Sequence, residues 1–403
     1  MNRVNTLLSK KYDSKYWKIG VCIYMITAAY LILFQSFRGL TSDDLFYSDF
    51  PAHLNVTSHS WYSLYHFPVL IANYIGGYRG AAIASLIVIL CCDFLCIYSI
   101  RKYFAEKISN RYIVDFLSVA VLLVSMIIIV FRERWYVGIG TPNPWHTPTY
   151  RVAKPFSILS FYYFLRLYEN LHLKIDGYKK DLALFSVFSM LSCAAKPSFM
   201  LAAAPAYIVM LFYQLIKEKF ACLMDCIYVG LSLLPGGLVI LFQNYITFQA
   251  PPSGDTSHVR FGINDVWSSA WVLKYHSMTG VSFIDGAVCF AITIFLAAGF
   301  PLFVSLVQAR SLKLSQKCSL LIYLFATFFN LFAYEDGFRK YHGNFGWSYL
   351  YALLFLFISA LEGLLCNPPE NKKVKAACWI LFYLHLISGI IYYIKVLCGF
   401  LYY

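Results

Sequence analysis

The feature that most constrains this chain is a series of long apolar runs separated by short polar segments. Of its 403 residues, 60% are hydrophobic and only 13% are charged, whereas a soluble domain carries about 25% charged residues. A bilayer core about 30 Å thick is crossed by a helix of roughly 20 apolar residues. The sequence therefore predicts an all-α polytopic membrane protein, with residues 1–403 forming a single transmembrane domain.

Eleven apolar runs are interpreted as membrane spans. The fourth and fifth are short for a bilayer, and short or broken helices are tolerated where they line a cavity. In chain order, the predicted spans are Trp17–Phe37, Gly80–Ile100, Tyr112–Phe131, Val152–Leu167, Leu182–Ala195, Phe199–Ile216, Ala221–Phe248, Gly286–Val307, Cys318–Tyr334, Trp347–Leu365 and Ala377–Phe400.

Lysine and arginine determine the predicted orientation. With the N-terminus in the cytoplasm, six short inner segments hold 21 of the 33 basic residues, as the positive-inside rule requires. An odd number of spans then places the C-terminus outside. We therefore expect a multi-pass protein of the inner (cytoplasmic) membrane, with outer loops at 38–79, 132–151, 249–285 and 335–346.

The outer loops differ from the inner ones in chemistry. They hold seven of the nine histidines, and they are rich in Trp, Pro and Gly. Polar and aromatic loops of this kind are typical of a binding or catalytic site, whereas the inner segments are only short and basic. The sequence therefore predicts a site on the side away from the cytoplasm.

The first outer loop carries the candidate catalytic residues. Asp43 and Asp44 follow the first span, and Asp49 precedes His53 by four residues, so that Asp49 and His53 share one face if a helix begins there. A carboxylate in this position can accept a proton from a hydroxyl group. The alternative is that Ser48 and Asp49 only cap a helix.

A second element of this loop, Ser58–Tyr74, is too polar and too aromatic to span a bilayer. We interpret it as a helix that lies in the membrane interface and is interrupted at Pro68.

Several basic residues lie on the outer side, where the positive-inside rule disfavours them. An anionic ligand would account for them, because Arg binds phosphate through two parallel hydrogen bonds and Lys acts as a point charge. The alternative for any one of them is contact with lipid headgroups, and for the 335–346 loop it is a local salt bridge. The candidate binding residues are Arg132, Arg134, His146, Arg151, Lys154, Lys196 and Arg339.

This arrangement resembles the integral-membrane glycosyltransferases of the GT-C fold, which use polyprenyl-phosphate sugars as donors. The resemblance lies in the acidic first outer loop, the interfacial helix after it, the outer basic residues and about a dozen spans. It implies that a first-loop carboxylate is the catalytic base and that outer basic residues hold the lipid phosphate. The Asp-Glu pair of several subfamilies is replaced here by Asp43-Asp44, which leaves open which aspartate acts.

The resemblance implies an inverting hexosyltransferase that moves a sugar from a polyprenyl-phosphate donor to a glycan or lipid-linked acceptor of the cell envelope. No motif identifies a cofactor, and Mg²⁺ or Mn²⁺ is kept as a candidate ion. Nucleic acid is excluded as a partner, because no nucleic-acid-binding motif is present.

Two other functions stay open. A polysaccharide polymerase or ligase acting on lipid-diphosphate glycans would rely on residues such as Arg260 and His276 in a later outer loop. A lipid-glycan flippase or transporter would need charged residues within the spans, and Asp93 is the strongest example of one.

Overall fold

The computed structural model describes residues 15–38, 49–55, 61–127, 140–171, 177–249, 258–262, 282–336 and 344–399, with the backbone alone at 38, 249 and 282–290. The described chain is almost entirely helical. In chain order, its elements are α2 (Lys15–Arg38), α3 (Asp49–Asn55), α4 (His66–Ala105), α5 (Arg111–Ala120), α6 (Pro148–Glu169), α7 (Tyr178–Ala195), α8 (Ser198–Lys217), α9 (Leu223–Leu231), α10 (Leu234–Asn244), a π-helical turn (Tyr245–Gln249), β1 (Val259–Phe261), α11 (Ser282–Val307), α12 (Leu314–Phe332), β2 (Ala333–Glu335), α13 (Gly346–Cys366) and α14 (Lys372–Leu397).

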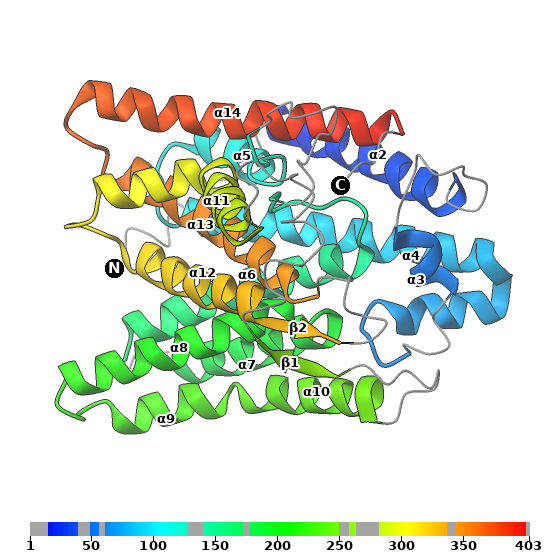
Figure 1. The fold of residues 1–403 in the computed structure, drawn as a ribbon, viewed down its shortest axis with the longest axis horizontal. Helices are drawn as coiled ribbons and strands as arrows, with labels where there is room; N and C mark the ends of the chain where they lie inside the picture. Colours follow the sequence, from blue (N-terminus) through cyan, green and yellow to red (C-terminus); the bar gives the residue numbers. More distant parts are fainter. Residues whose placement is uncertain are drawn as a thin grey trace.

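Within the described residues, seven helical segments are long and apolar enough to cross a membrane. They support the prediction of a polytopic helical membrane protein. Most helices run side by side, and the turns between α8 and α9, α11 and α12, and α13 and α14 meet at one end of the bundle (Figure 1). Helix α13 occupies the core, since 89% of its apolar window is buried inside the protein.

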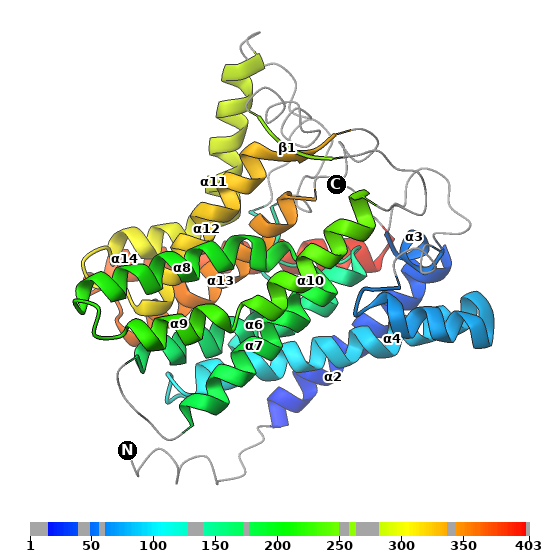
Figure 2. The ribbon, with the colours of Figure 1, turned by 90° about the horizontal axis from the view of Figure 1, so that it is seen from below.

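Helices also form at the remaining predicted spans, as α5, α6, α7 and α11. The predicted short spans become α6 and α7, which carry charged residues such as Arg151, Lys154 and Asp181. Helix α11 contains Pro301, and its N-terminal part stands away from the other helices (Figure 2). Proline cannot donate the hydrogen bond that would continue the helix, and bends of this kind follow.

The prediction of a helix over Ser58–Tyr74 broken at Pro68 was wrong in its bounds. The helix begins at His66, and Pro68 lies in its first turn, where no backbone donor is needed. The break falls at Gly76 and Gly77 instead. Gly77 has φ +57° and ψ −154°, a conformation that essentially only glycine adopts.

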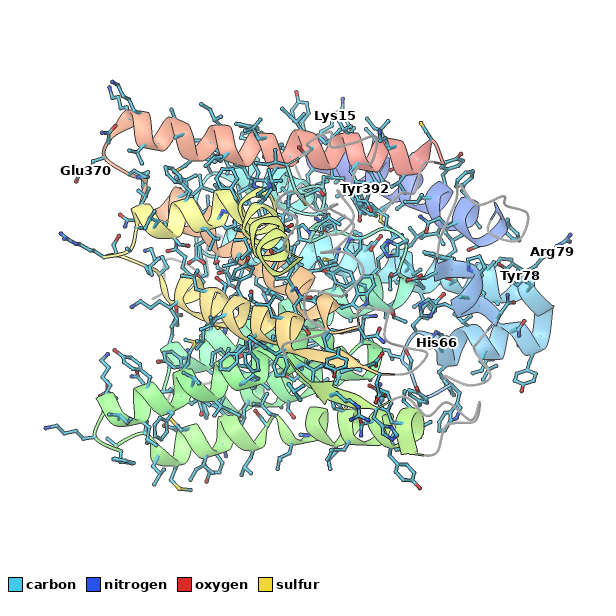
Figure 3. The ribbon with its side chains drawn as sticks, viewed as in Figure 1. Lys15, His66, Tyr78, Arg79, Glu370 and Tyr392 are labelled. Carbon is cyan, nitrogen blue, oxygen red and sulfur yellow. The ribbon has the colours of Figure 1, made fainter. Side chains whose placement is uncertain are left out.

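The chain reverses direction at this break, so α4 consists of two antiparallel limbs, 66–75 and 78–105 (Figure 1). Tyr78 and Arg79 mark the reversal, at the opposite end of the bundle from Glu370 (Figure 3). A Cβ atom at Gly80 would lie 2.3 Å from the carbonyl oxygen of Ala72, so the close approach of the limbs requires glycine there as well. Only the second limb corresponds to the predicted span Gly80–Ile100.

The predicted span Tyr112–Phe131 was also wrong as a continuous helix. Helix α5 ends at Ala120, and the chain continues through a turn into a segment without regular secondary structure at 124–127. This segment lies inside the protein, where other elements satisfy its backbone. The Ser125 N–H donates to the His385 carbonyl (3.1 Å), and the Ile127 N–H donates to the Leu296 carbonyl (2.9 Å).

His385 completes this arrangement from α14. Its Nε2 accepts from the Phe300 N–H (3.3 Å), so its Nδ1 carries the proton and donates to the Ser125 carbonyl (2.7 Å). Asn143 donates to the carbonyls of Val121 and Val124, both at 2.9 Å. Irregular backbone at membrane depth is stable only with such internal partners.

Gly389 offers a test of this packing. A Cβ atom there would lie 1.6 Å from the Leu123 carbonyl oxygen, whereas a Cβ atom at Gly237 in α10 meets nothing within 4 Å. We expect Gly389→Ala to destabilise the fold by about 3 kcal/mol or more, since the overlapping atoms belong to the backbone. Gly237→Ala should be neutral or stabilising. Thermal unfolding in detergent measures both, and equal midpoints for the two variants would contradict this packing.

Candidate functional site

The candidate site begins at Asp49, the first residue of α3. Its carboxylate Oδ2 accepts a hydrogen bond from the Thr147 hydroxyl (2.6 Å), which lies immediately before α6. Within the described chain, this bond joins Asp49 to a segment 98 residues away rather than to the backbone of α3. The carboxylate therefore does more than cap its own helix.

His53 lies one turn further along α3 and contacts the start of α4. Its Nδ1 is 2.9 Å from His66 Nε2, and the two rings stack with centroids 5.1 Å apart. Burial, together with His66, Lys196 and His146, holds the pKa of His53 well below its usual range. His53 is therefore neutral at physiological pH and can exchange hydrogen bonds but not supply charge.

Two hydrogen bonds to backbone carbonyls hold the α7–α8 turn beside residues 63 and 64, just before α4. The Leu64 N–H donates to the Ala194 carbonyl (2.9 Å), and the Ser63 hydroxyl donates to the Ala195 carbonyl (3.4 Å). The residue after Ala195 is Lys196, so these contacts carry its side chain towards the first outer loop.

Lys196 lies over the ring of Trp347, with Nζ 4.5 Å from the ring centroid. Burial lowers the pKa of Lys196 to about 8, and the nearby carboxylates of Asp49 and Glu335 limit the decrease. Glu335, at the end of β2, accepts a hydrogen bond from the Asn344 side-chain amide (2.6 Å). Lys196 is therefore a desolvated cation close to two acidic side chains.

His146 also packs against Trp347. Its ring centroid is 5.6 Å from that of Trp347. Burial lowers the pKa of His146, Asp49 opposes this decrease, and Lys196 adds to it. Asp49, His53, His146 and Lys196, four of the predicted site residues, thus come together from three distant parts of the sequence.

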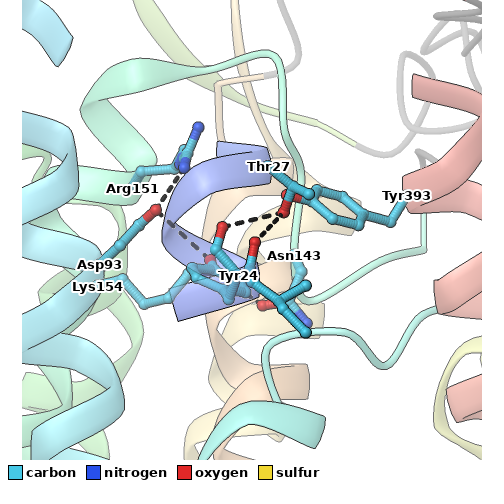
Figure 4. Close-up of polar contacts among 8 residues, drawn as sticks. Tyr24, Thr27, Asp93, Asn143, Arg151, Lys154 and Tyr393 are labelled. Carbon is cyan, nitrogen blue, oxygen red and sulfur yellow. Dashed lines mark hydrogen bonds and ion pairs between the residues drawn. The ribbon is translucent and has the colours of Figure 1, made fainter. Parts of the chain in front are cut away.

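Arg151 and Lys154 lie one and two turns into α6, further along the helix than Thr147, which contacts Asp49. Arg151 pairs with Asp93 of α4, and both are buried, with exposed fractions of 1% and 4%. The Tyr24 hydroxyl points to the same carboxylate oxygen at 3.5 Å. Figure 4 shows this group within the bundle, where α2, α4 and α6 approach one another.

The second cation of α6 has a different partner. Lys154 Nζ donates to the Asn143 side-chain oxygen (2.9 Å) and lies over the Tyr150 ring, 5.2 Å from its centroid. Arg151 is 5.4 Å from the ring centroid of Trp145. Arg151, Lys154 and Asp93 form the α6 charge cluster, which explains how two cations predicted to lie in loop and span are held inside the protein.

The remaining predicted residues lie outside the described chain. These are Asp44 of the first outer loop, and Arg132, Arg134 and Arg339 of later loops.

The residues of the two alternative functions have other surroundings. Arg260 of β1 is exposed and pairs with Asp336 beside β2, where the strands run antiparallel. His276 lies outside the described residues. Asp93, the acid that a transporter would need, is engaged by Arg151.

Sequence reasoning did not predict several members of the site. Thr147 and His66 lie in segments that the sequence predicts as outer loops, and Trp347 begins a predicted span. Nothing local reveals which distant residue each of them meets. Glu335 carries a partial signal, as an acid placed between an apolar run and a polar loop. Among the described residues, no group of three or more His, Cys, Asp or Glu side chains is placed to hold a metal ion.

Comparisons with known proteins give no match: no family model, curated protein or solved structure is significantly similar to this chain.

The lowered pKa of Lys196 can be measured without knowing the substrate. Only the neutral amine reacts with acylating reagents, so its reactivity should rise with a midpoint near pH 8, rather than near the usual 10.5. Pulse acylation followed by mass spectrometry measures each lysine separately, with exposed Lys375 as the internal control. Identical pH profiles for the two lysines would contradict the desolvated setting of Lys196.

Proposed function

We propose that this protein is an integral-membrane glycosyltransferase of GT-C type that transfers a sugar from a polyprenyl-phosphate donor to a cell-envelope acceptor. The observation that carries the proposal is the position of Asp49. This first-loop carboxylate, bonded to Thr147 at 2.6 Å, lies close to Lys196 and His146. Thr147 directly precedes α6, the helix that carries the buried cations Arg151 and Lys154. A transfer reaction of this kind needs a base for the acceptor hydroxyl and positive charge for the leaving phosphate. Asp49 can provide the first, and the nearby cations can provide the second.

The chemistry follows from these two halves. Asp49 accepts the proton of an acceptor hydroxyl, whose oxygen forms a bond to the anomeric carbon as the bond from that carbon to the phosphate oxygen breaks. Attack from the face opposite the phosphate inverts the configuration. The negative charge that develops on the leaving phosphate is stabilised by cations such as Lys196 and Arg151.

The neighbouring histidines favour this assignment. Because the pKa values of His53 and His146 are lowered, these rings are neutral at physiological pH and add no positive charge beside Lys196. They can instead donate to or accept from substrate hydroxyl groups. Thr147 fixes one carboxylate oxygen, which leaves the other for the acceptor.

The membrane setting fits a lipid-linked donor. The first limb of α4 exposes Phe67, Ile71, Tyr74 and Ile75, which recur at the spacing of one helical face. Such a face suits the outer membrane interface, as expected for the helix that follows the first-loop acid. In an inner-membrane protein, the basic turns that meet at the other end of the bundle would then face the cytoplasm.

Replacing Asp49 by Asn tests the proposal most simply. Loss of the general base should lower turnover by about 10²–10⁴-fold, with little change in folding, because the amide oxygen still accepts from Thr147. The measurement is transfer of radiolabelled sugar from polyprenyl-phosphate donors in proteoliposomes. Asp225→Asn, a change in the first turn of α9, serves as the matched control and should keep full activity.

The same assay identifies which first-loop acid acts. If Asp49→Asn and Asp44→Asn each keep full turnover, the first-loop carboxylates are not the base and the proposed mechanism is wrong.

A further inference from the structure

The α6 charge cluster holds a buried guanidinium with hydrogen-bonding capacity to spare. Asp93 engages Nη2 of Arg151, whereas Nε and Nη1 have no hydrogen-bond partner among the described residues although both are shielded from solvent. A buried donor left without a partner costs free energy, and such a group in a native protein requires an explanation. Nε–H and Nη1 face different edges of the guanidinium group, so each of them offers one charge-assisted hydrogen bond to an anion such as a phosphate.

The surroundings of these donors favour an anion. Arg151 lies in the first turn and a half of α6, a helix of 22 residues, whose N-terminal end attracts negative charge. Lys154 is three residues further on and is also buried, so it lies on a neighbouring part of the same face. The other polar groups in contact with this cluster, Tyr24 and Asn143, are uncharged.

The charges of the cluster do not cancel. Arg151 and Lys154 are positive and Asp93 is negative, so the buried cluster carries a net charge of +1. In a site of low dielectric constant, uncompensated charge is costly. A ligand with one negative charge neutralises the cluster. A ligand with two or three negative charges leaves an excess of negative charge, which no nearby group offsets.

We propose that Asp93 determines substrate specificity, by setting the charge of the α6 cluster so that it accepts a singly charged phosphodiester lipid and discriminates against a lipid diphosphate. This inference rests on the proposed function and names its donor class: a sugar joined to the lipid through one phosphate. Asp93 acts through Arg151 and does not touch the reacting atoms.

Binding of two short-chain probes tests the proposal, using the full chain in lipid nanodiscs. Farnesyl methyl phosphate carries one negative charge, and farnesyl diphosphate carries at least two. Wild-type protein should bind the diester about tenfold or more tightly than the diphosphate. Asp93→Asn keeps the shape and raises the cluster charge to +2, so it should abolish or reverse that preference, whereas Asp93→Glu should retain it.

A matched control separates this effect from general destabilisation. Glu362 is another buried and paired acid, bound to Lys107 at 3.1 Å and hydrogen-bonded by Ser315 at 2.6 Å. It lies near the C-terminal end of α13, so Glu362→Gln should perturb stability as Asp93→Asn does but leave the preference unchanged. If Asp93→Asn does not fold, Lys154→Gln replaces it: a neutral cluster should bind both probes at least about tenfold more weakly.

Two results would overturn the proposal: an unchanged preference in Asp93→Asn, or unchanged binding of both probes in Arg151→Ala. Failure of the proposed function looks different. If the preference shifts with Asp93 as expected but no polyprenyl-phosphate sugar is ever transferred, the charge-selective site stands and the glycosyltransferase proposal fails. If transfer occurs and depends on Asp49 while the preference ignores Asp93, only the present inference fails.

Discussion

The structure depends on one constraint: inside an apolar bundle without water, every backbone and charged group must find its partner within the protein. The chain meets this constraint where it departs from regular helix. The irregular segment after α5 is hydrogen-bonded to His385 and to the carbonyl of Leu296, and Asn143 donates to carbonyls of the turn before it. Because these partners come from α11, α14 and the start of the α6 segment, the break in one predicted span ties together helices that would otherwise only pack.

The same constraint shapes the site. Asn143 satisfies the broken segment with its amide and accepts from Lys154 with its oxygen, so the fold of the core and the placement of a cation share one side chain. Arg151 is buried only because Asp93 faces it. At the N-terminal end of α6, Thr147 and Lys196 approach Asp49. Helix α6 thus joins a candidate acid–base site to a candidate anion site a turn or two deeper.

The sequence predicted the helical membrane class and most helices, because apolar runs of 20 residues carry that information locally. It also singled out Asp49, His53, His146, Arg151, Lys154 and Lys196, because charged residues and histidines gather in or beside the predicted outer loops. It could not predict that α4 reverses at Gly76 and Gly77 or that α5 stops at Ala120, because both breaks depend on contacts with distant segments. Thr147 and Trp347 were missed as site residues for the same reason, and Asp93 was predicted only as the acid that a transporter would need, not as the partner of Arg151.

The most direct test of the central claim is a density map of the full chain in nanodiscs with a bound polyprenyl phosphate. The account predicts phosphate density within hydrogen-bonding distance of Arg151 Nε or Nη1, on the side of the bundle that holds Asp49. Ordered lipid-phosphate density at the opposite end, beside the basic turns that follow α8, α11 and α13, would contradict it.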